Sequence, residues 1–200
     1  MEVITLLVSL AALVFALFTF YWVQWRAPRI SVLPGILMRA GSTGSTGFQF
    51  YLPITFVNHS HKPGVIYNLE LHVRHLDSPK EFRMMASRFS ELKDSNKIVD
   101  VEIHNAFSVF GRTANTRMVR FVWWDASTPN FHLAAGTYAM KLRTWISRSG
   151  KHIESEMHFS IDEDQIDVLL RAMARSEASV IEFATSDLSP TNHCKDISAK

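Results

Sequence analysis

Cysteine is almost absent from this sequence, because Cys194 is the only one and it lies in a polar C-terminal segment. A single cysteine excludes an intramolecular disulfide. The chain must therefore be held together by a hydrophobic core, and the residues that follow its first apolar segment are numerous enough to form one. The absence of disulfides also favours a reducing compartment.

A strong net charge and the common catalytic motifs are absent as well. The formal charge is +2, and the basic residues are interspersed with acidic ones, which argues against a nucleic-acid partner. No G-x-S-x-G, H-E-x-x-H or cysteine pair occurs, and the glycine-rich run Gly41–Gly47 leads into Phe48 rather than the Lys-Ser/Thr of a P-loop. We therefore expect no enzymatic activity and no cofactor, and a small-molecule ligand is not expected.

Charge is also missing from one long stretch, Val3–Val23. As a helix this stretch spans about 30 Å, the thickness of the hydrocarbon core of a bilayer. It lacks the basic start of a secretory signal peptide, and it ends in aromatic residues rather than in a small-residue cleavage site. The sequence predicts a transmembrane anchor over residues 1–25, followed by an extended linker over 26–29.

The charges that flank the apolar stretch predict its orientation. No Lys or Arg precedes it, whereas Arg26, Arg29 and, further on, Arg39 follow it. By the positive-inside rule, the chain is a single-pass protein of the cell membrane with its large domain in the cytoplasm. The Asn58-His59-Ser60 sequon would matter only if that domain were lumenal in a eukaryote.

Small and weakly polar residues follow one side of the predicted anchor at spacings of three and four. Such residues permit close helix–helix approach in lipid. This pattern predicts pairing of the helix with itself or with the helix of another subunit, and the alternative is that these residues are ordinary components of a membrane helix. The face consists of Thr5, Ser9, Ala12, Ala16 and Thr19.

After the anchor, apolar and polar residues alternate in short segments that are typical of half-buried strands. Phe48–Val57 and Val65–Leu76 are examples, and the outer face of the second carries Asn68, Glu70, His72 and Arg74. The clearest hairpin joins 136–146 to 153–161. Alignment of its apolar faces also pairs Lys141 with Glu156 and Arg143 with Glu154, and opposite charges favour the same register.

The C-terminal part is predicted to be helical and then unstructured. Asp162, with Gln165 three residues later, forms a capping-box pattern at the start of an amphipathic helix over 162–177. The apolar stripe of this helix contains Ile166, Leu169, Leu170 and Met173. Residues 178–200 are mostly polar, and we expect most of this tail to be disordered.

Many short strands separated by turn residues predict a mainly β domain over 30–161. Gly136-Thr137-Tyr138 resembles the G-x-Y of immunoglobulin-like sandwiches, in which the tyrosine forms a corner. Met140 occupies the position of the usual cysteine, so packing would replace the inter-sheet disulfide. The resemblance implies an antiparallel, immunoglobulin-like β-sandwich with one C-terminal helix, and the layout resembles that of single-pass bacterial membrane proteins.

Nine histidines raise the question of a metal site. His72 and His75 lie on opposite faces of their strand, because their separation is odd. His59 and His61 share one loop and are the best candidates, but a zinc site needs three or four convergent ligands. A ligand- or metal-binding sensory domain tethered to the membrane is therefore the alternative function, and we expect no metal.

Exposed Trp and Arg residues suggest where a protein could bind, since both are enriched in interface cores. In the predicted strands, Arg120, Trp124, Arg143 and Trp145 point outward. Either the C-terminal helix or a loop covers one of these faces, or the residues form a binding surface. The expected function is a non-catalytic, membrane-anchored protein-interaction or assembly subunit. It would bind through its β-sandwich and, in assembly, through its transmembrane helix.

Overall fold

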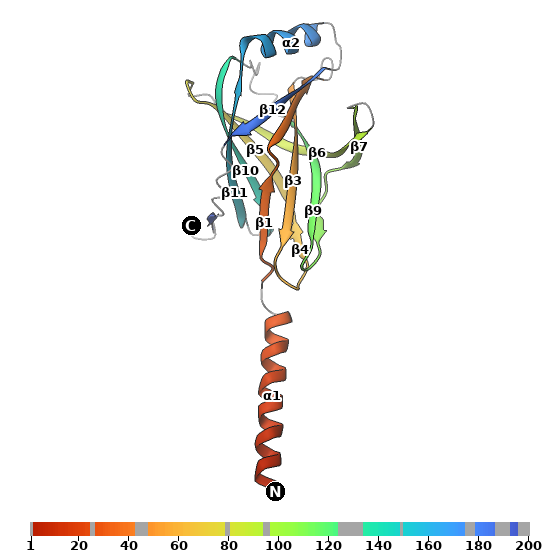
Figure 1. Ribbon diagram of the computed structural model, residues 1–200, viewed down its shortest axis with the longest axis vertical. Coiled ribbons are helices and arrows are strands. Elements are labelled where there is room, and N and C mark those ends of the chain that lie inside the picture. The colour runs from red at the N-terminus through yellow and green to blue at the C-terminus, as the bar shows by residue number, and fades with distance from the viewer. Residues whose placement is uncertain are drawn as a thin grey trace.

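The computed structural model describes residues 2–24, 27–42, 48–78, 81–93, 97–123, 134–148, 150–174, 179–186 and 193–195. Helix α1 (Glu2–Gln24) projects from one end of a strand-rich body, and helix α2 (Glu163–Ala174) lies over the opposite end (Figure 1). The apolar side chains of α1 are exposed. Its 22-residue span Glu2–Val23 has a mean hydropathy of 2.7, so it is long and apolar enough to cross a membrane. Signal sequences share these two properties.

Short strands make up most of the body, as the alternating sequence predicts. The first six are β1 (Ile30–Pro34), β2 (Leu37–Ser42), β3 (Phe48–Asn58), β4 (Gly64–Ile66), β5 (Asn68–His75) and β6 (Glu81–Lys93). They are followed by β7 (Lys97–Ile103), β8 (Phe107–Val109), β9 (Ala114–Trp123), β10 (Gly136–Trp145), β11 (His152–Ile161), β12 (Ser179–Ser186) and β13 (His193–Lys195).

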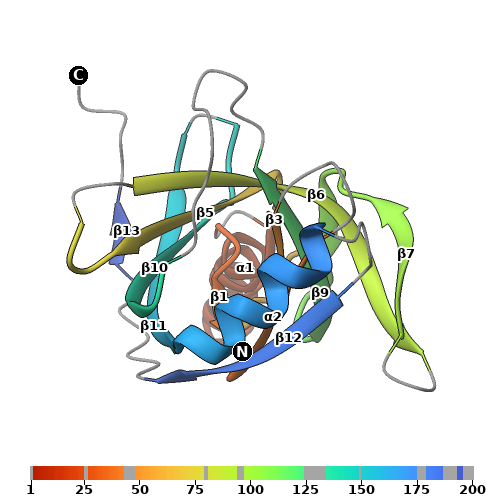
Figure 2. The ribbon, with the colours of Figure 1, turned by 90° about the horizontal axis from the view of Figure 1, so that it is seen from above.

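The strands close into an eight-stranded antiparallel barrel, so the prediction of an immunoglobulin-like sandwich is wrong. Around the barrel the order is β3, β2, β12, β11, β10, β5, β6 and β9, and β9 pairs with β3 again. The ring is visible in the view along α1 (Figure 2). A sandwich would leave edges on two sheets, whereas here β9 bridges β3 and β6, and β12 bridges β2 and β11.

The tyrosine corner is present although the sandwich is not. The Tyr138 hydroxyl donates a hydrogen bond to the carbonyl oxygen of Ala134 and accepts one from its N–H, both at 2.9 Å. The side chain is buried, and burial raises the pKa of Tyr138. A short motif of this kind fixes a local contact and does not choose between a barrel and a sandwich.

Side chains that alternate inward along the strands fill the barrel, as expected for eight strands. Phe50, Phe121, Tyr138 and Phe159 are among the largest fully buried side chains. The rings of Tyr138 and Phe159 are stacked with centroids 5.0 Å apart, and the Phe50 ring meets Phe159 edge-on at 5.9 Å. The inward-pointing side chains form the core. The charged side chains of the barrel wall therefore lie on its outer face.

Beta-strands β1 and β2 pair in succession with the same edge of β3. The break between them lies at Gly35, whose N–H donates to the carbonyl of Pro53 at 2.6 Å. A Cβ at Gly35 would come within 2.6 Å of the Pro53 ring. Pro53, which has no N–H to donate to a strand ladder, thus lies opposite an interruption of the ladder.

The predicted hairpin is confirmed in register, with Tyr138 opposite Phe159, Met140 opposite Met157 and Leu142 opposite Ser155. The capping box of α2 is also confirmed. The Gln165 N–H donates to the Asp162 carboxylate at 2.7 Å, and the Asp162 N–H donates to the Gln165 side-chain oxygen at 3.2 Å.

Other boundaries differ from the expectation. The segment 65–76 is split at Tyr67, because Gly64–Ile66 pairs with β8 in a separate two-stranded sheet. Ile66 is buried, and Val65 is half-buried. Residues 179–186, predicted as part of a disordered tail, form β12 inside the barrel wall. Phe183 of β12 is buried and belongs to the core of the barrel. Leu170 of the predicted α2 stripe is exposed.

Candidate interaction site

The outer face of β5, β10 and β11 carries the densest polar arrangement on the described barrel wall. The antiparallel registers stack its residues in successive rungs across the three strands. From the α2 end downward, the rungs are Arg74–Ala139–His158, His72–Lys141–Glu156, Glu70–Arg143–Glu154 and Asn68–Trp145–His152. β6 extends the first two rungs with Glu81 and Arg83.

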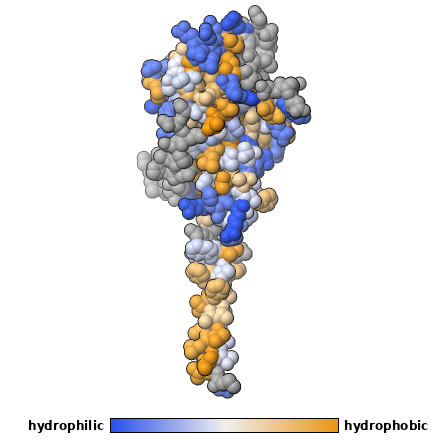
Figure 3. Space-filling view, in the orientation of Figure 1, coloured by the Kyte–Doolittle hydropathy of each residue, from blue (hydrophilic) through white to orange (hydrophobic). Residues whose placement is uncertain are grey.

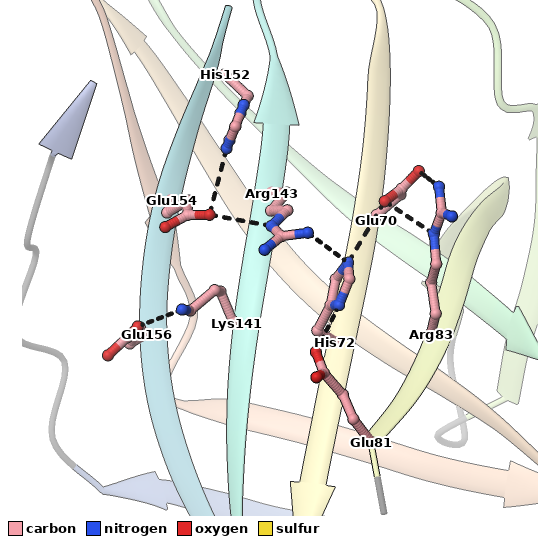
Figure 4. A network of polar contacts seen from close by, with 9 residues as sticks. All are labelled: Glu70, His72, Glu81, Arg83, Lys141, Arg143, His152, Glu154 and Glu156. Carbon is pink, nitrogen blue, oxygen red and sulfur yellow. Dashed lines mark hydrogen bonds and ion pairs between the residues drawn. The ribbon is translucent and has the colours of Figure 1, made fainter. Parts of the chain in front are cut away.

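Two buried carboxylates anchor this arrangement (Figure 4). Glu70 is 3% exposed, and Arg83 donates two hydrogen bonds to it, one of them from Nε at 3.0 Å. The hydrogen bond to Glu70 raises the pKa of Arg83. Glu154 is 7% exposed and accepts from Arg143 Nε at 3.0 Å. Buried carboxylates need such partners, so both arginines are held in place.

His72 links the two halves of the network. Its Nδ1 lies 2.8 Å from Glu81, and its Nε2 lies 3.2 Å from the Arg143 guanidinium. Glu81 can only accept and Arg143 can only donate. The same Nε2 lies 3.5 Å from the Glu70 carboxylate, so His72 contacts charged groups of β5, β6 and β10.

His152 and Trp145 complete the lower end of the site. His152 is 3% exposed, and its Nε2 lies 3.2 Å from Glu154. The ring of Trp145 is tilted against the His152 ring with centroids 5.5 Å apart. Trp145 is half-buried on the outer face, and α2 packs on β2 and β12 at the end of the barrel instead of covering it.

A hollow of about 290 Å³ opens at the upper end of the same face. Its floor is Ala139, whose short side chain lies between the long side chains of the neighbouring strands. Arg74 is exposed and His158 is half-buried on either side of it, and neither side chain has an ion-pair partner among the described residues. Glu81 and Glu156 also line the hollow, but they form ion pairs with His72 and Lys141. The hollow therefore offers two basic groups without ion-pair partners over a small apolar floor.

The sequence did identify part of this site. It predicted Arg143 and Trp145 as outward residues and found the outward face of β5, including Glu70, His72 and Arg74. It did not bring β5 beside β10, because those strands are distant in the chain. The alternating pattern shows which way a side chain points, but it does not show which strands are neighbours.

Arg120, another predicted surface residue, does not join this site. Arg120 lies outward on β9, which β6 and β5 separate from β10, and it donates to Asp100 at 2.5 Å. Asp100 also accepts from Ser90 at 2.9 Å. Trp124 lies outside the described residues. The predicted surface is thus divided between two clusters, one centred on Asp100 and one on Glu70 and Glu154.

The predicted packing face of α1 is exposed along its length. Its hydroxyl groups already have partners within the helix, since Ser9 Oγ donates to the Thr5 carbonyl at 2.9 Å and Thr19 Oγ1 donates to the Phe15 carbonyl at 2.8 Å. Ala12 and Ala16 leave the same side free of large side chains. The face can pack closely without leaving a hydroxyl donor unsatisfied in lipid.

The metal candidates do not converge. In the described part of the chain, no group of three or more His, Cys, Asp or Glu side chains could hold a metal ion. His59 Nε2 instead lies 3.0 Å from the Ser31 hydroxyl. The loop with His59 and His61 therefore provides no set of metal ligands that would support the alternative sensory function.

Comparisons with known proteins add little to the site. No protein-family model matches the chain, and no curated protein matches its sequence. The crystal structure of Spo0M, a sporulation control protein from Bacillus subtilis, is similar with a TM-score of 0.31 and 13% identity, over 73% of this chain. The chain covers 55% of that protein, and so weak a likeness supports no argument about function.

Proposed function

We propose that this protein is a non-catalytic, membrane-anchored binding subunit that engages another protein through the outer face of β5, β10 and β11. The observation that carries the proposal is the hollow over Ala139. It presents Arg74 and His158 without carboxylate partners, while the rungs below it hold their own charges in ion pairs. An acidic side chain of a partner would pair with these two basic groups.

The rest of the face has the properties of an interface. Trp145 and Arg143 belong to the residue types enriched at binding hot spots. The network around Glu70 and Glu154 fixes the strands' outer side chains, so little conformational entropy is lost when a partner binds. The arrangement contains no nucleophile paired with a base, and we expect binding rather than turnover.

The anchor sets where binding occurs. We propose that α1 stays attached and crosses the cell membrane once, with the barrel in the cytoplasm. Its aromatic C-terminal end and the arginines that follow it support this orientation. Its face of Thr5, Ser9, Ala12, Ala16 and Thr19 supports a role for the helix in self-association or in pairing with another subunit's helix. Replacement of Ser9 and Ala12 by leucine should weaken that association in a membrane two-hybrid assay, and an unchanged signal would contradict it.

A cross-linking experiment on native membranes tests the proposed binding face. Ala139→Phe fills the hollow without removing any polar contact, and Ala184→Phe makes the same change on an exposed position of β12. We expect wild type and Ala184→Phe to co-purify with the same cross-linked partner, and Ala139→Phe to lose at least about tenfold of it. A monomer without any partner, or equal recovery from all three proteins, would contradict the proposal.

A further inference from the structure

The end of the barrel next to α1 is formed by loops that contain basic residues and no acidic ones. We call it the basal surface, and it comprises the described residues 27–29, 59–63, 110–113, 146–148 and 150–151. These segments contain Arg29, His59, His61, Lys62, Arg112, Arg148 and Lys151, and neither Asp nor Glu. Hydrophilic residues gather at this end, directly above the apolar surface of α1 (Figure 3).

The opposite end of the barrel carries an excess of acidic residues, and Arg171 of α2 and the exposed Arg74 of β5 are the basic residues that accompany them. The α2 cap and its preceding residue contribute Asp162, Glu163, Asp164 and Asp167, and the β5–β6 turn contributes Asp77. The nearly neutral total charge of the chain therefore conceals a strong separation of charge along the axis of the molecule. The basic end is the one that faces the anchor (Figure 1).

The basal loops are held rigidly. Asn58 is 1% exposed, and its amide donates to the carbonyls of Lys62 and Val109 at 2.9 and 3.0 Å. Its oxygen accepts from the N–H and the hydroxyl of Ser60 at 3.0 and 2.6 Å. Gly111 lies so close to the next loop that a Cβ would reach 1.9 Å from the His61 carbonyl oxygen. The basic side chains thus project from a fixed platform.

Arg112 occupies a backbone position that does not suit it. Its φ is 55°, in the left-handed region that glycine and asparagine adopt more readily than arginine. Its guanidinium has no hydrogen-bond or ion-pair partner among the described residues, and neither does that of Arg29. An unpaired arginine in this backbone conformation, beside Phe110 with its 69% exposure, is free to make a contact outside the chain.

The chain's connectivity keeps the basal surface near the membrane. Only residues 25–29 separate α1 from β1, and an extended chain of that length reaches about 17 Å. A hollow of about 200 Å³ is lined by Trp22 and Val23 of α1 together with Arg29, His59, His61 and Arg112. Aromatic residues of a membrane helix lie at the level of the lipid headgroups, and this hollow therefore brings the arginines to the depth of lipid phosphates.

We propose that the basal surface docks on anionic phospholipids, with Arg29 and Arg112 binding headgroup phosphates and Phe110 entering the interface. Arginine pairs well with phosphate oxygens, and each basic residue near an anionic membrane strengthens its binding roughly fivefold. The proposal rests on the proposed function in one respect, namely that α1 remains in the membrane. Docking of the basal surface adds a lipid partner, and it holds the axis of the barrel perpendicular to the bilayer.

Hydrogen exchange of the full chain in nanodiscs tests this docking. Discs of phosphatidylcholine are compared with discs that also contain phosphatidylglycerol. We expect amides of residues 59–63 and 110–113 to exchange at least about fivefold more slowly in the anionic discs, and about 1 M salt, with its Debye length of roughly 3 Å, to abolish the difference. Equal exchange in both discs would overturn the proposal.

Matched variants separate docking from folding. Arg112→Asn suits the left-handed backbone, so we expect it to keep the fold while Arg29→Gln/Arg112→Asn loses the lipid effect. Arg112→Lys should keep it, and Arg171→Gln at the far end should not change it. A lipid effect that survives the double variant would overturn the assignment. Recovery of the chain in carbonate-washed membranes tests the anchor separately, so the anchor can hold while docking fails.

Discussion

Asn58 is the residue on which the basal surface of the barrel most depends. Its buried side chain satisfies two donors and two acceptors of neighbouring groups. We predict that Asn58→Ala lowers the free energy of unfolding by about 2 to 4 kcal/mol, because it leaves buried carbonyls unpaired. Ser60→Ala should cost about 1 kcal/mol. Urea unfolding of the full chain in detergent measures both, and equal effects would contradict this account.

His104 makes stability depend on pH. Burial lowers its pKa from 6.5, and its Nε2 has no hydrogen-bond partner in the described structure. The unfolded chain therefore binds the proton first as pH falls. We predict that stability is lost as pH drops below 6.5 toward the lower pKa of the folded state, and that it levels off below it.

His104→Phe removes that proton and keeps an aromatic ring beside Phe89, whose centroid is 5.3 Å from that of His104. Unfolding midpoints measured from pH 7 to pH 5 should fall less steeply in the variant than in wild type. The same slope in both proteins would show that another group is responsible.

The hairpin of β10 and β11 offers two charge pairs in one element, and they differ in burial and in the number of additional polar partners. The Glu154 side chain of the Arg143 pair is 9% exposed, whereas the Glu156 side chain of the Lys141 pair is 54% exposed. We predict a coupling energy of about 1.5 to 3 kcal/mol for the first pair and about 0.2 to 1 kcal/mol for the second. Double-mutant cycles by urea unfolding give both values, and a larger coupling for the exposed pair would refute the argument.

The same hairpin shows how far sequence can predict this fold. Its register follows from local information, since apolar faces and opposite charges select one alignment of neighbouring strands. The α2 capping box is equally local. Closure of the barrel is different, because β9 pairs with β3 and β6, which are far from it in the chain. The spacing of apolar residues does not show which strands become its neighbours. The site on β5 and β10 was missed for the same reason, although its outward residues were identified.

The sequence did not predict strand β12, because polar residues lie on either side of its short alternating segment. Phe183 is the buried residue that the alternation offers there, and it lies between a polar helix end and a polar tail. Thr185 fixes the strand further, since its N–H donates to the Ile36 carbonyl at 2.8 Å. Polar composition alone therefore predicted disorder where a strand completes the wall.

Removal of β12 should open the barrel. We predict that a chain ending at Ala174 becomes sensitive to protease and aggregates, because β2 and β11 lose the strand that joins them and expose their edges. A chain ending at Ser186 keeps β12 and loses only the three-residue pairing of β13, so it should stay resistant. Limited proteolysis in detergent compares the two, and equal resistance would show that β12 is dispensable.

At the scale of the whole molecule, an apolar helix, a basic barrel end and an acidic cap follow one another along a single axis. The two proposed contacts lie at different places on this axis. In the proposed arrangement the basal surface faces the bilayer, while the hollow over Ala139 lies on the barrel wall and stays accessible to a protein when the base is occupied. Anchoring, docking and partner binding are therefore compatible in one molecule.

The orientation of this axis is the last prediction. Because Arg26 and Arg29 follow α1 and no basic residue precedes it, we predict that a C-terminal green fluorescent protein fluoresces and a C-terminal alkaline phosphatase is inactive. Glu2→Lys combined with Arg26→Glu and Arg29→Glu should reverse both signals in part of the population. An active phosphatase on the wild-type chain would put the barrel outside the cell. The basal arginines would then face the outer leaflet, and docking would depend on the anionic lipid available there.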